Sequence, residues 1–581
     1  MVDVPMEVDV KRVIVVAAAA ALAAATLASP AQAVRTTTEP AAQTEYVVLY
    51  KEGANAADAQ KAIEAAGGSI VKVNEAVGVA TVTTTNSGFV AAIRDDSAIE
   101  GVARNRAVGV APKTARVQAG VVKAIQSKAV EKEGRADAAH AKRGKKPTNE
   151  PLSDLQWDLD QIHANEAHKY ERGDKRVLVG IIDTGVDGTH PDIAPNFSKE
   201  LSRNFTVDIP TDADGNEVDG PCEVASCVDP VDVDDDGHGT HVASSIASPI
   251  NKLGISGVAP NVTIVNIRAG QDSGYFFLQP TVDALTYAGD IGINVVNMSY
   301  YVDPWLFNCV DNPADSPENQ LEQATVIKAT QRALDYAHNR GVTLISAAGN
   351  EAMDYTKTNV DTTSPDFVSV PGQAPYPRTI TPASCKSMPG QGNHVLSVSS
   401  TGVSKRKAYF SNYGNGFIHV AAPGGDVYDT PDNTRDISKA TLAAYPKALA
   451  VANGEIDENG EPTVPYVVKD CKGSTCGYYQ YLQGTSMASP RAVGVAALII
   501  SKYGKHDPRR PARLTMDPAA VERILLDTAT PMACPNPAAF TYTRHLPSGS
   551  TVTATHTCEG GTGGNGFYGK GIVDALNAVR R

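Results

Sequence analysis

The sequence predicts an α/β protein built on a doubly wound parallel sheet, preceded by a small α+β domain. Two observations carry this prediction. From about residue 152 onward, near-continuous apolar segments alternate with helical ones, which is typical of parallel strands covered on both faces. Residues 45–103 carry a shorter strand and helix pattern of their own, and a basic segment over residues 104–150 separates the two regions.

The N-terminus has the pattern of an export signal. Lys11 and Arg12 precede the apolar run "VIVVAAAAALAAATLA", and Ala31 and Ala33 follow in the A-x-A arrangement. This pattern predicts a signal peptide over residues 1–33. The alternative is a membrane anchor, but the apolar run is short for a membrane span. We therefore expect a secreted, extracellular protein without membrane attachment after signal cleavage.

The next region is a small domain followed by a linker. "EYVVLY" and "VGVATVTT" predict strands, "ANAADAQKAIEAAGG" predicts a helix that ends at glycines, and "SGFVAAIRDDSAIEGVARN" adds a second helix and a last strand. Residues 104–146 hold twelve Lys and Arg against three Asp and Glu, with few large apolar side chains. This composition indicates an exposed linker that proteases can reach. A nucleic-acid-binding arm is the alternative, but the net charge of −13 argues against nucleic acid as a partner.

The third region, residues 151–581, repeats strand and helix. A helix is expected over residues 321–341, with Gly341 as its C-terminal stop. Functional sites in such sheets lie at the carboxyl ends of the strands. The predicted strands are "RVLVGIID" (176–183), "VTIVNI" (262–267), "INVVNMS" (293–299), "VTLISAA" (342–348) and "HVLSVSS" (394–400).

The eight cysteines all follow residue 200, and an even number in an exported chain indicates disulfides. Two pairs are close enough in sequence to close local loops. Zinc is the alternative, but neither close pair has the C-x₂-C spacing and no histidine accompanies them. The close pairs are Cys222 with Cys227 and Cys471 with Cys476; pairing Cys309 with Cys385 and Cys534 with Cys558 is a guess among 105 connectivities.

Polar residues stand at strand ends and helix starts in this region. Asp183 ends the first strand, Asn350 follows another, and His238 begins a helix between two glycines. Ser486 lies at the start of an Ala-rich helix, since Pro490 is expected in a first helical turn. Taken singly, the aspartate is interpreted as a turn residue, the serine as a helix cap, and the histidine as a helix cap or a packed residue.

Together, these residues supply the groups of a nucleophilic site. A serine hydroxyl needs a histidine to accept its proton, and the histidine needs a carboxylate to fix its tautomer. A side-chain amide can donate a hydrogen bond to the developing oxyanion. The chain offers one of each, in the order Asp, His and Ser.

Four stretches, "DTGVDGTHPDI", "GHGTHVA", "AAGN" and "GTSMASP", resemble the signature blocks of the subtilisin-like serine proteases. The resemblance implies a subtilisin-like fold over residues 151–581 and a serine endopeptidase that cleaves polypeptides. In that reading Asp183 orients His238, His238 is the base and then the acid, Ser486 is the nucleophile, and Asn350 helps to bind the oxyanion. Cleavage should then need a neutral His238 and decline below the imidazole pKa, near 6.5 when unperturbed.

The same resemblance explains the N-terminal domain. Residues 34–103 resemble the inhibitor-type propeptide of these proteases, so we expect an inactive precursor whose own propeptide is an intramolecular inhibitor. Residues 104–150 then contain the processing region. We expect a monomer that binds neither nucleic acid nor membrane.

The sequence departs from the family pattern beside the substrate groove. The groove residues implied by the resemblance are Ser299, Tyr300, Tyr301, Ala348 and Gly349. Two tyrosines replace the usual small residue and glycine. They either narrow the groove or pack beneath the loop that follows. The connection over residues 426–480 is also longer than usual, and such loops more often shape access than chemistry.

No cofactor is expected for the chemistry, but a structural calcium ion is. "DADGNE" resembles the start of an EF-hand, yet Glu217 stands where that loop requires glycine. A better candidate, implied by the resemblance, is the family's calcium loop, to which Asp192 and Asn251 would contribute side-chain oxygens. Asp154 and the carbonyls near Pro249, Leu253 and Ile255 would complete it. The alternative is ordinary loop polarity.

Three other functions are alternatives. The same site could transfer the acyl group to an amine instead of water, although nothing in the sequence favours this. A non-enzymatic exported binding protein is the second alternative, and the four filled catalytic positions argue against it. A lipase-type hydrolase is disfavoured because Ala488 stands where G-x-S-x-G requires its second glycine.

Overall fold

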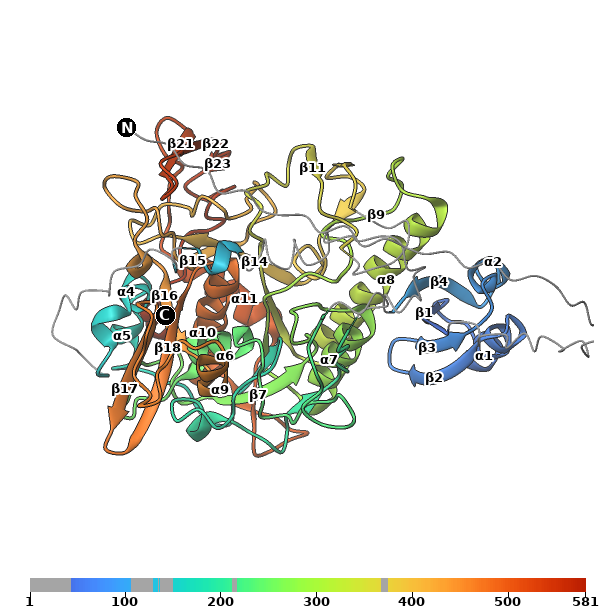
Figure 1. Cartoon of the computed structure of the whole chain (residues 1–581), viewed down its shortest axis with the longest axis horizontal. Coiled ribbons are helices and arrows are strands. Elements are labelled where there is room, and N and C mark those ends of the chain that lie inside the picture. Colours follow the sequence, from blue (N-terminus) through green and yellow to red (C-terminus); the bar gives the residue numbers. More distant parts are fainter. Residues whose placement is uncertain (1–42, 106–128, 134, 136–149, 212–216, 367–374) are drawn as a thin grey trace, which may run out of the picture. The chain divides into compact units, whose positions relative to one another are not determined.

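The computed structural model describes residues 43–105, 129–133, 135, 150–211, 217–366 and 375–581 (Figure 1). The predicted signal peptide and most of the 104–150 linker lie outside the described residues, as does most of the "DADGNE" segment. The described residues fall within one compact unit, Ala42–Arg581.

A seven-stranded parallel sheet forms the centre of the C-terminal region, in the order β15-β14-β10-β8-β5-β7-β6. The five predicted strands are all confirmed. β15 and the short edge strand β6 were not predicted. The strands are β5 (Leu178–Ile182), β6 (Arg203–Asn204), β7 (Thr263–Arg268), β8 (Val295–Met298), β10 (Thr343–Ala347), β14 (Val395–Thr401) and β15 (Val420–Pro423).

Helices cover both faces of this sheet. α6 (His238–Ala247) and α10 (Thr485–Tyr503) lie on one face, and α7 (Leu278–Ile291) and α8 (Pro317–Asn339) lie on the other (Figure 1). Strand β5 shows why its apolar run is continuous. Val179 and Ile181 belong to the core cluster of α6 and α10, whereas Leu178 and Ile182 belong to that of α7 and α8.

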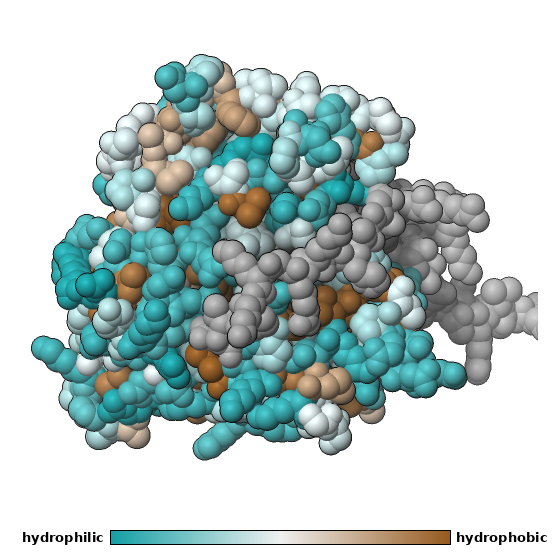
Figure 2. All heavy atoms as spheres, turned by 90° about the vertical axis from the view of Figure 1, so that its left-hand side faces the viewer, coloured by the Kyte–Doolittle hydropathy of each residue, from teal (hydrophilic) through white to brown (hydrophobic). Residues whose placement is uncertain are grey.

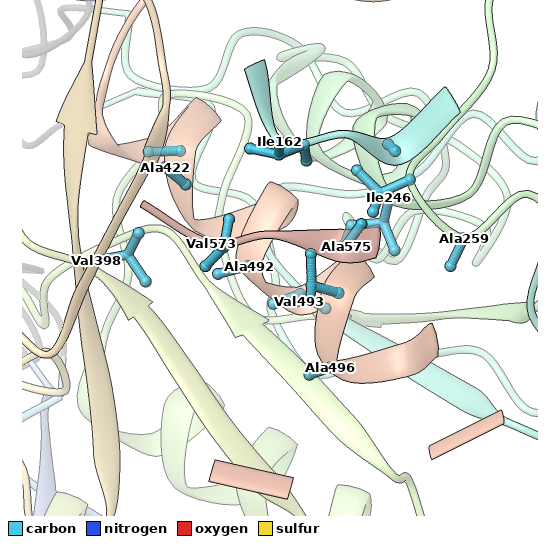
Figure 3. Packing of buried hydrophobic residues seen from close by; sticks show 14 of the residues in the cluster. Ile162, Ile246, Ala259, Val398, Ala422, Ala492, Val493, Ala496, Val573 and Ala575 are labelled. Atoms are coloured by element: carbon cyan, nitrogen blue, oxygen red, sulfur yellow. The ribbon is translucent and has the colours of Figure 1, made fainter. Parts of the chain in front are cut away.

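Helix α10 lies within the larger core cluster. Its residues Ala492, Val493 and Ala496 are buried together with Val398 of β14 and Val573 near the C-terminus (Figure 3). Small side chains along the helix let neighbouring elements approach closely, which fixes the position of its first turn. The other helices of this region are α4 (Trp157–Gln161), α5 (Ala164–Ala167), α11 (Pro518–Thr528) and α12 (Ala575–Arg580).

The N-terminal domain is a four-stranded antiparallel sheet, in the order β2-β3-β1-β4, with two helices. One face of its sheet forms the domain's own core, which includes Val48 and Ile63. The other face presents Val47 and Leu49 to the core cluster of α7 and α8. Its elements are β1 (Thr44–Tyr50), α1 (Ala56–Ala65), β2 (Ser69–Asn74), β3 (Val79–Thr84), α2 (Phe89–Ile93) and β4 (Ile99–Arg104).

The long connection over residues 426–480 folds into a small antiparallel sheet, in the order β16-β18-β17. Its elements are β16 (Thr441–Ala444), α9 (Lys447–Ala452), β17 (Val467–Lys472) and β18 (Thr475–Leu482). Because only two residues separate β18 from α10, this insertion forms a wall beside Ser486.

The described residues contain all four expected disulfides: Cys222–Cys227, Cys309–Cys385, Cys471–Cys476 and Cys534–Cys558. The remaining elements are short pairs and turns at the periphery. They are β9 (Asn308–Cys309) with β13 (Cys385–Lys386), β11 (Asn359–Asp361) with β12 (Arg378–Ile380), β19 (Lys505–His506) with β20 (Leu514–Thr515), β21 (Ala539–His545) with β22 (Thr551–Thr557), β23 (Gly560–Gly561) with β24 (Gly564–Asn565), and the 3₁₀ turns Ser153–Leu155, Ala194–Asn196 and Ile437–Lys439.

Hydrophilic residues cover most of the face that carries α4, α5 and β17, and apolar residues there are scattered (Figure 2). Scattered surface apolar residues are normal for proteins in water. Among the residues that the structure describes, no helix is both long and apolar enough to cross a membrane.

Candidate active site

Asp183 and His238 form a hydrogen-bonded pair at the carboxyl edge of the sheet. Asp183 follows β5 and is buried, and its Oδ1 lies 2.7 Å from Nδ1 of His238, the first residue of α6. A Cβ atom on Gly239 would lie 2.1 Å from the carbonyl oxygen of Gly185. Glycine at position 239 therefore lets α6 approach the turn after β5 closely enough for the pair to form.

Ser486 is the second residue of α10, and it does not cap the helix. The N-cap is Gly484, which has no side-chain cap hydrogen bond. Because the helix begins at Thr485, Pro490 lies in its second turn, and the prediction of a first-turn proline is wrong. Pro490 cannot donate to the carbonyl of Ser486, and that carbonyl instead accepts a hydrogen bond of 3.1 Å from Ser299 Oγ.

The side-chain amide of Asn350 is held in one orientation by Thr485. Asn350 Oδ1 accepts hydrogen bonds of 2.9 Å from both the backbone N–H and the hydroxyl of Thr485. The amide nitrogen is left as the donor, and it would lie 3.6 Å from a Cβ atom on Gly484, beside the serine. Thr485 was missed as a functional residue, although it stands next to Ser486 in the "GTSMASP" stretch.

One groove brings the predicted site residues together. His238, Asn350 and Ser486 line it, and Asp183 lies behind His238. The five predicted substrate-groove residues also line it: Ser299, Tyr300, Tyr301, Ala348 and Gly349.

Each tyrosine both lines the groove and packs against the protein. The Tyr300 ring stacks on Phe276 with centroids 4.2 Å apart, and the Tyr301 hydroxyl donates to Asp366 at 3.0 Å. Both tyrosines are therefore groove-lining residues whose positions are held by contacts within the protein, and whether they narrow the groove for a substrate stays a prediction.

The electrostatics of His238 depend on two carboxylates. Burial lowers the pKa of its imidazole, but Asp183 and Glu131 oppose this effect, and the net pKa lies well above the usual value. Glu131 Oε1 is 3.6 Å from His238 Nε2, on the side of the ring opposite Asp183. The carboxylate of Glu131 thus lies where the base would face the serine and its substrate.

Glu131 belongs to a short segment of the basic linker that lies in the groove. The carbonyl oxygen of Val130 accepts from Gln483 Nε2 at 2.9 Å, and that of Glu131 accepts from Gln483 N at 3.1 Å. No local sequence pattern indicates this contact, since Glu131 and His238 are more than a hundred residues apart.

Comparison with known proteins agrees with this geometry. The sequence profile described as the subtilase family matches residues 174–571. The chain belongs to the subtilase family. Within this subtilase, the matched region contains Asp183, His238, Asn350 and Ser486.

Curated relatives of this subtilase are about a quarter identical to it. A thermophilic serine proteinase of Bacillus sp. (strain AK1) is 27% identical over 357 residues, which are 61% of this chain and 60% of the relative. Subtilisin DY of Bacillus licheniformis is 26% identical over 348 residues, which are 60% of this chain and 85% of the relative. The chain therefore spans less than two thirds of the first relative's length.

Solved structures share the fold. The epidermin leader peptide processing serine protease of Staphylococcus aureus matches with a TM-score of 0.56 and 20% identity, covering 93% of this chain and 98% of that chain. Fervidolysin from Fervidobacterium pennivorans matches with a TM-score of 0.54 and 20% identity, covering 93% of this chain and 61% of that chain. These matches support the subtilisin-like fold predicted from the sequence.

The residues expected to bind calcium lie together away from the groove. Asn251 Nδ2 donates to Asp192 Oδ1 at 3.0 Å, and Glu150 Oε2 accepts from Leu253 N at 3.0 Å. Burial raises the pKa of Asp192, and Glu150 adds to the rise. Within the described part of the chain, Glu150 Oε1 and Asn251 Oδ1 are buried without a hydrogen-bond partner. Two carboxylates and two unsatisfied oxygens fit a hard cation such as calcium.

A second acidic group is formed by the loop before His238 together with the segment that follows β7. Ligand atoms of four carboxylates lie within 4.8 Å of one another, from Glu223, Asp229, Asp235 and Asp272. The buried Arg268 forms ion pairs with Asp229 and with Asp272, the latter at 2.9 Å. The arginine therefore already balances part of the negative charge of this group.

Proposed function

We propose that the chain is a secreted serine endopeptidase, made as an inactive precursor, that hydrolyses peptide bonds through an acyl-enzyme on Ser486. The observation that carries this proposal is the 2.7 Å contact between Asp183 and His238 at the groove that Ser486 and Asn350 line. The family membership supports the same chemistry.

In the proposed mechanism, Ser486 Oγ attacks the carbonyl carbon of the scissile bond while His238 Nε2 takes the hydroxyl proton. Asp183 stabilises the imidazolium that forms. Asn350 Nδ2 donates a hydrogen bond to the oxyanion of the tetrahedral intermediate. The C–N bond then breaks, and His238 returns the proton to the leaving amine.

Deacylation repeats these steps with water as the nucleophile. His238 takes a proton from water, the resulting hydroxide adds to the acyl carbon, and the ester bond to Ser486 breaks. The serine oxygen regains the proton, and the peptide leaves as a carboxylic acid. An amine in place of water would give acyl transfer, and no described contact favours that outcome.

Contacts of the N-terminal domain support the precursor proposal. Lys72 Nζ lies 2.8 Å from Asp283 Oδ2 on α7, and Arg104 Nε lies 2.8 Å from Glu322 Oε2 on α8. Residues 34–103 would act as the intramolecular inhibitor, and the Glu131 carboxylate would block the groove near His238. Residues 1–33 would direct export and then be removed, and the processed enzyme would act as a monomer.

Calcium would have a structural role. Asp192, Asn251 and Glu150 would supply oxygen ligands, and the ion would neutralise two buried carboxylates. No catalytic step needs it, since the groove residues carry the proposed chemistry.

A fluorophosphonate probe tests the nucleophile directly. After self-processing, the wild-type chain should be labelled on Ser486 alone, as read by peptide mapping. His238→Ala, whose prosegment is removed by an added protease because this variant cannot process itself, should not be labelled. Ser489 is an internal reference on the same helix, since its hydroxyl donates to Asn297 Oδ1 and, among the described residues, is hydrogen-bonded to no histidine. Labelling of Ser489 instead of Ser486, or equal labelling in His238→Ala, would contradict the proposal.

A further inference from the structure

A polar pocket beside the groove encloses the side chain of Arg135. We call it the guanidinium pocket and define it by Glu455, Tyr466 and Gln480, all from the long connection between β15 and α10. Arg135 Nη1 lies 3.8 Å from Glu455 Oε1, and Nη2 donates to Gln480 Oε1. The guanidinium carbon lies 4.6 Å from the centre of the Tyr466 ring. The pocket thus offers a carboxylate, an amide oxygen and an aromatic face to one planar cation.

The pocket is built around a buried negative charge. Glu455 is only 5% exposed, and Tyr466 OH donates to its Oε1 at 3.0 Å. Among the described residues, Glu455 Oε2 is buried with no hydrogen-bond partner. A buried carboxylate without a counter-charge is costly, so the folded insertion favours a bound cation.

Arg135 supplies that cation in the precursor. Burial lowers the pKa of its guanidinium, while the charges of Glu455 and Asp236 oppose this effect. Asp236 is also the residue whose Oδ1 accepts from the backbone N–H of His238 at 3.2 Å. A negative side chain close to the catalytic histidine therefore also favours the positive charge of Arg135.

The pocket opens onto the catalytic groove. Gln480 and Asp236 line the same groove as His238 and Ser486. A polypeptide that follows the groove past Ser486 therefore passes the mouth of the guanidinium pocket.

We propose that the guanidinium pocket is a substrate subsite that binds the arginine side chain of a polypeptide. Arg135 fills it in the precursor, and an arginine of the substrate fills it once the prosegment has left. This inference rests on the proposed endopeptidase function. Arginine suits the pocket better than lysine, because its planar fork donates to two acceptors at once while its face stacks on a ring.

Matched peptides test the subsite by kcat/KM. Each fluorogenic decapeptide carries one arginine, and the set of peptides places this arginine at every position on both sides of the cleaved bond. Each peptide is paired with one in which citrulline, which is neutral and nearly isosteric, replaces the arginine. The enzyme is the full chain with Arg135→Ala, after self-processing, so that its own arginine cannot compete. At one position the ratio of kcat/KM for arginine to citrulline should reach about tenfold, the size of one good charged contact.

A variant pair assigns the preference to the pocket. Glu455→Gln should bring the arginine-to-citrulline ratio close to one. Glu461→Gln is the matched control on the same insertion, since Glu461 is exposed and pairs with Lys469 at 2.6 Å; its ratio should stay near tenfold. A ratio near one at every position in the parent enzyme, or a ratio unchanged by Glu455→Gln, would overturn the subsite.

A binding measurement separates this inference from the proposed function. Ser486→Ala with Arg135→Ala cannot cleave by the proposed route, so its prosegment is first removed by an added protease that cuts within residues 104–150. Fluorescence anisotropy then gives its Kd for the labelled arginine and citrulline peptides. The arginine peptide should bind about tenfold more tightly. Equal affinities would overturn the subsite even if the enzyme cleaves peptides, whereas absence of cleavage with a tenfold affinity difference would overturn only the endopeptidase proposal.

Discussion

Replacing Asn350 by aspartate tests whether its amide stabilises the oxyanion. Asn350→Asp keeps an oxygen that accepts from the backbone and hydroxyl of Thr485, so the loop should retain both 2.9 Å hydrogen bonds. Only the donor that faces the groove is lost, and a carboxylate oxygen takes its place. The variant therefore separates the catalytic loss from a loss of folding.

The size of the effect follows from one lost donor. An oxyanion-hole hydrogen bond in a water-excluded site contributes about 2.7–4 kcal/mol, and each 1.36 kcal/mol corresponds to a factor of ten in rate. We expect kcat to fall by about 10²–10³, or more because of the added negative charge. KM should change little, since the hydrogen bond forms mainly in the transition state.

The assay is cleavage of a fluorogenic peptide under steady-state conditions, with the melting temperature measured in parallel. Asn350→Leu is the comparison variant, because it removes the donor and also leaves both Thr485 groups without their acceptor. It should lose activity to a similar degree and also stability. A kcat for Asn350→Asp within tenfold of wild type, with an unchanged melting temperature, would refute the role of this amide.

Three further predictions concern the precursor, the disulfides and calcium. Glu131→Gln removes one of the carboxylates that raise the pKa of His238. Because the base must be unprotonated, self-processing should begin at a lower pH in this variant than in wild type. The pH profile of self-processing is read by intact mass, and an unchanged profile would contradict this prediction. Removing the Cys309–Cys385 disulfide, which closes a loop of 76 residues, should lower the free energy of unfolding by about 4.5 kcal/mol. Removing Cys222–Cys227, which closes a loop of 5 residues, should lower it by about 2 kcal/mol. Urea titration measures both losses, and equal losses would contradict the dependence on loop length. Calcium at 100 times its Kd should add about 2.7 kcal/mol to the stability of wild type and much less to that of Asp192→Asn, as read by calorimetry with and without EDTA.

Local sequence patterns predicted the parts of the fold that depend on local chemistry. The strand before Asp183 is apolar on both faces because helices cover both faces of the sheet. Its continuous apolar run therefore predicted a buried parallel strand. β2 was missed because all of its residues are exposed or half-exposed, and every second or third one is polar, at the edge of a small sheet. Pro490 misled the placement of the helix start, since the carbonyl it leaves unbonded is satisfied by Ser299, a residue from a different strand end.

The site was predictable in its residues but not in its contacts. Asp183, His238 and Ser486 each stand in a recognisable stretch, and they line or support one groove. The position of Glu131 beside His238 was not predictable, because it depends on how a distant linker segment packs against Gln483. The guanidinium pocket likewise joins residues of the insertion to a residue of the linker, and no local pattern records such a pairing.

The most direct test of the account compares the wild-type chain with Ser486→Ala, both expressed in full and followed by intact mass over time. Only the wild type should lose its N-terminal segment, at a bond within residues 104–150, and then cleave casein. If both chains keep that segment or both lose it at the same rate, and neither cleaves casein, the serine endopeptidase account is contradicted.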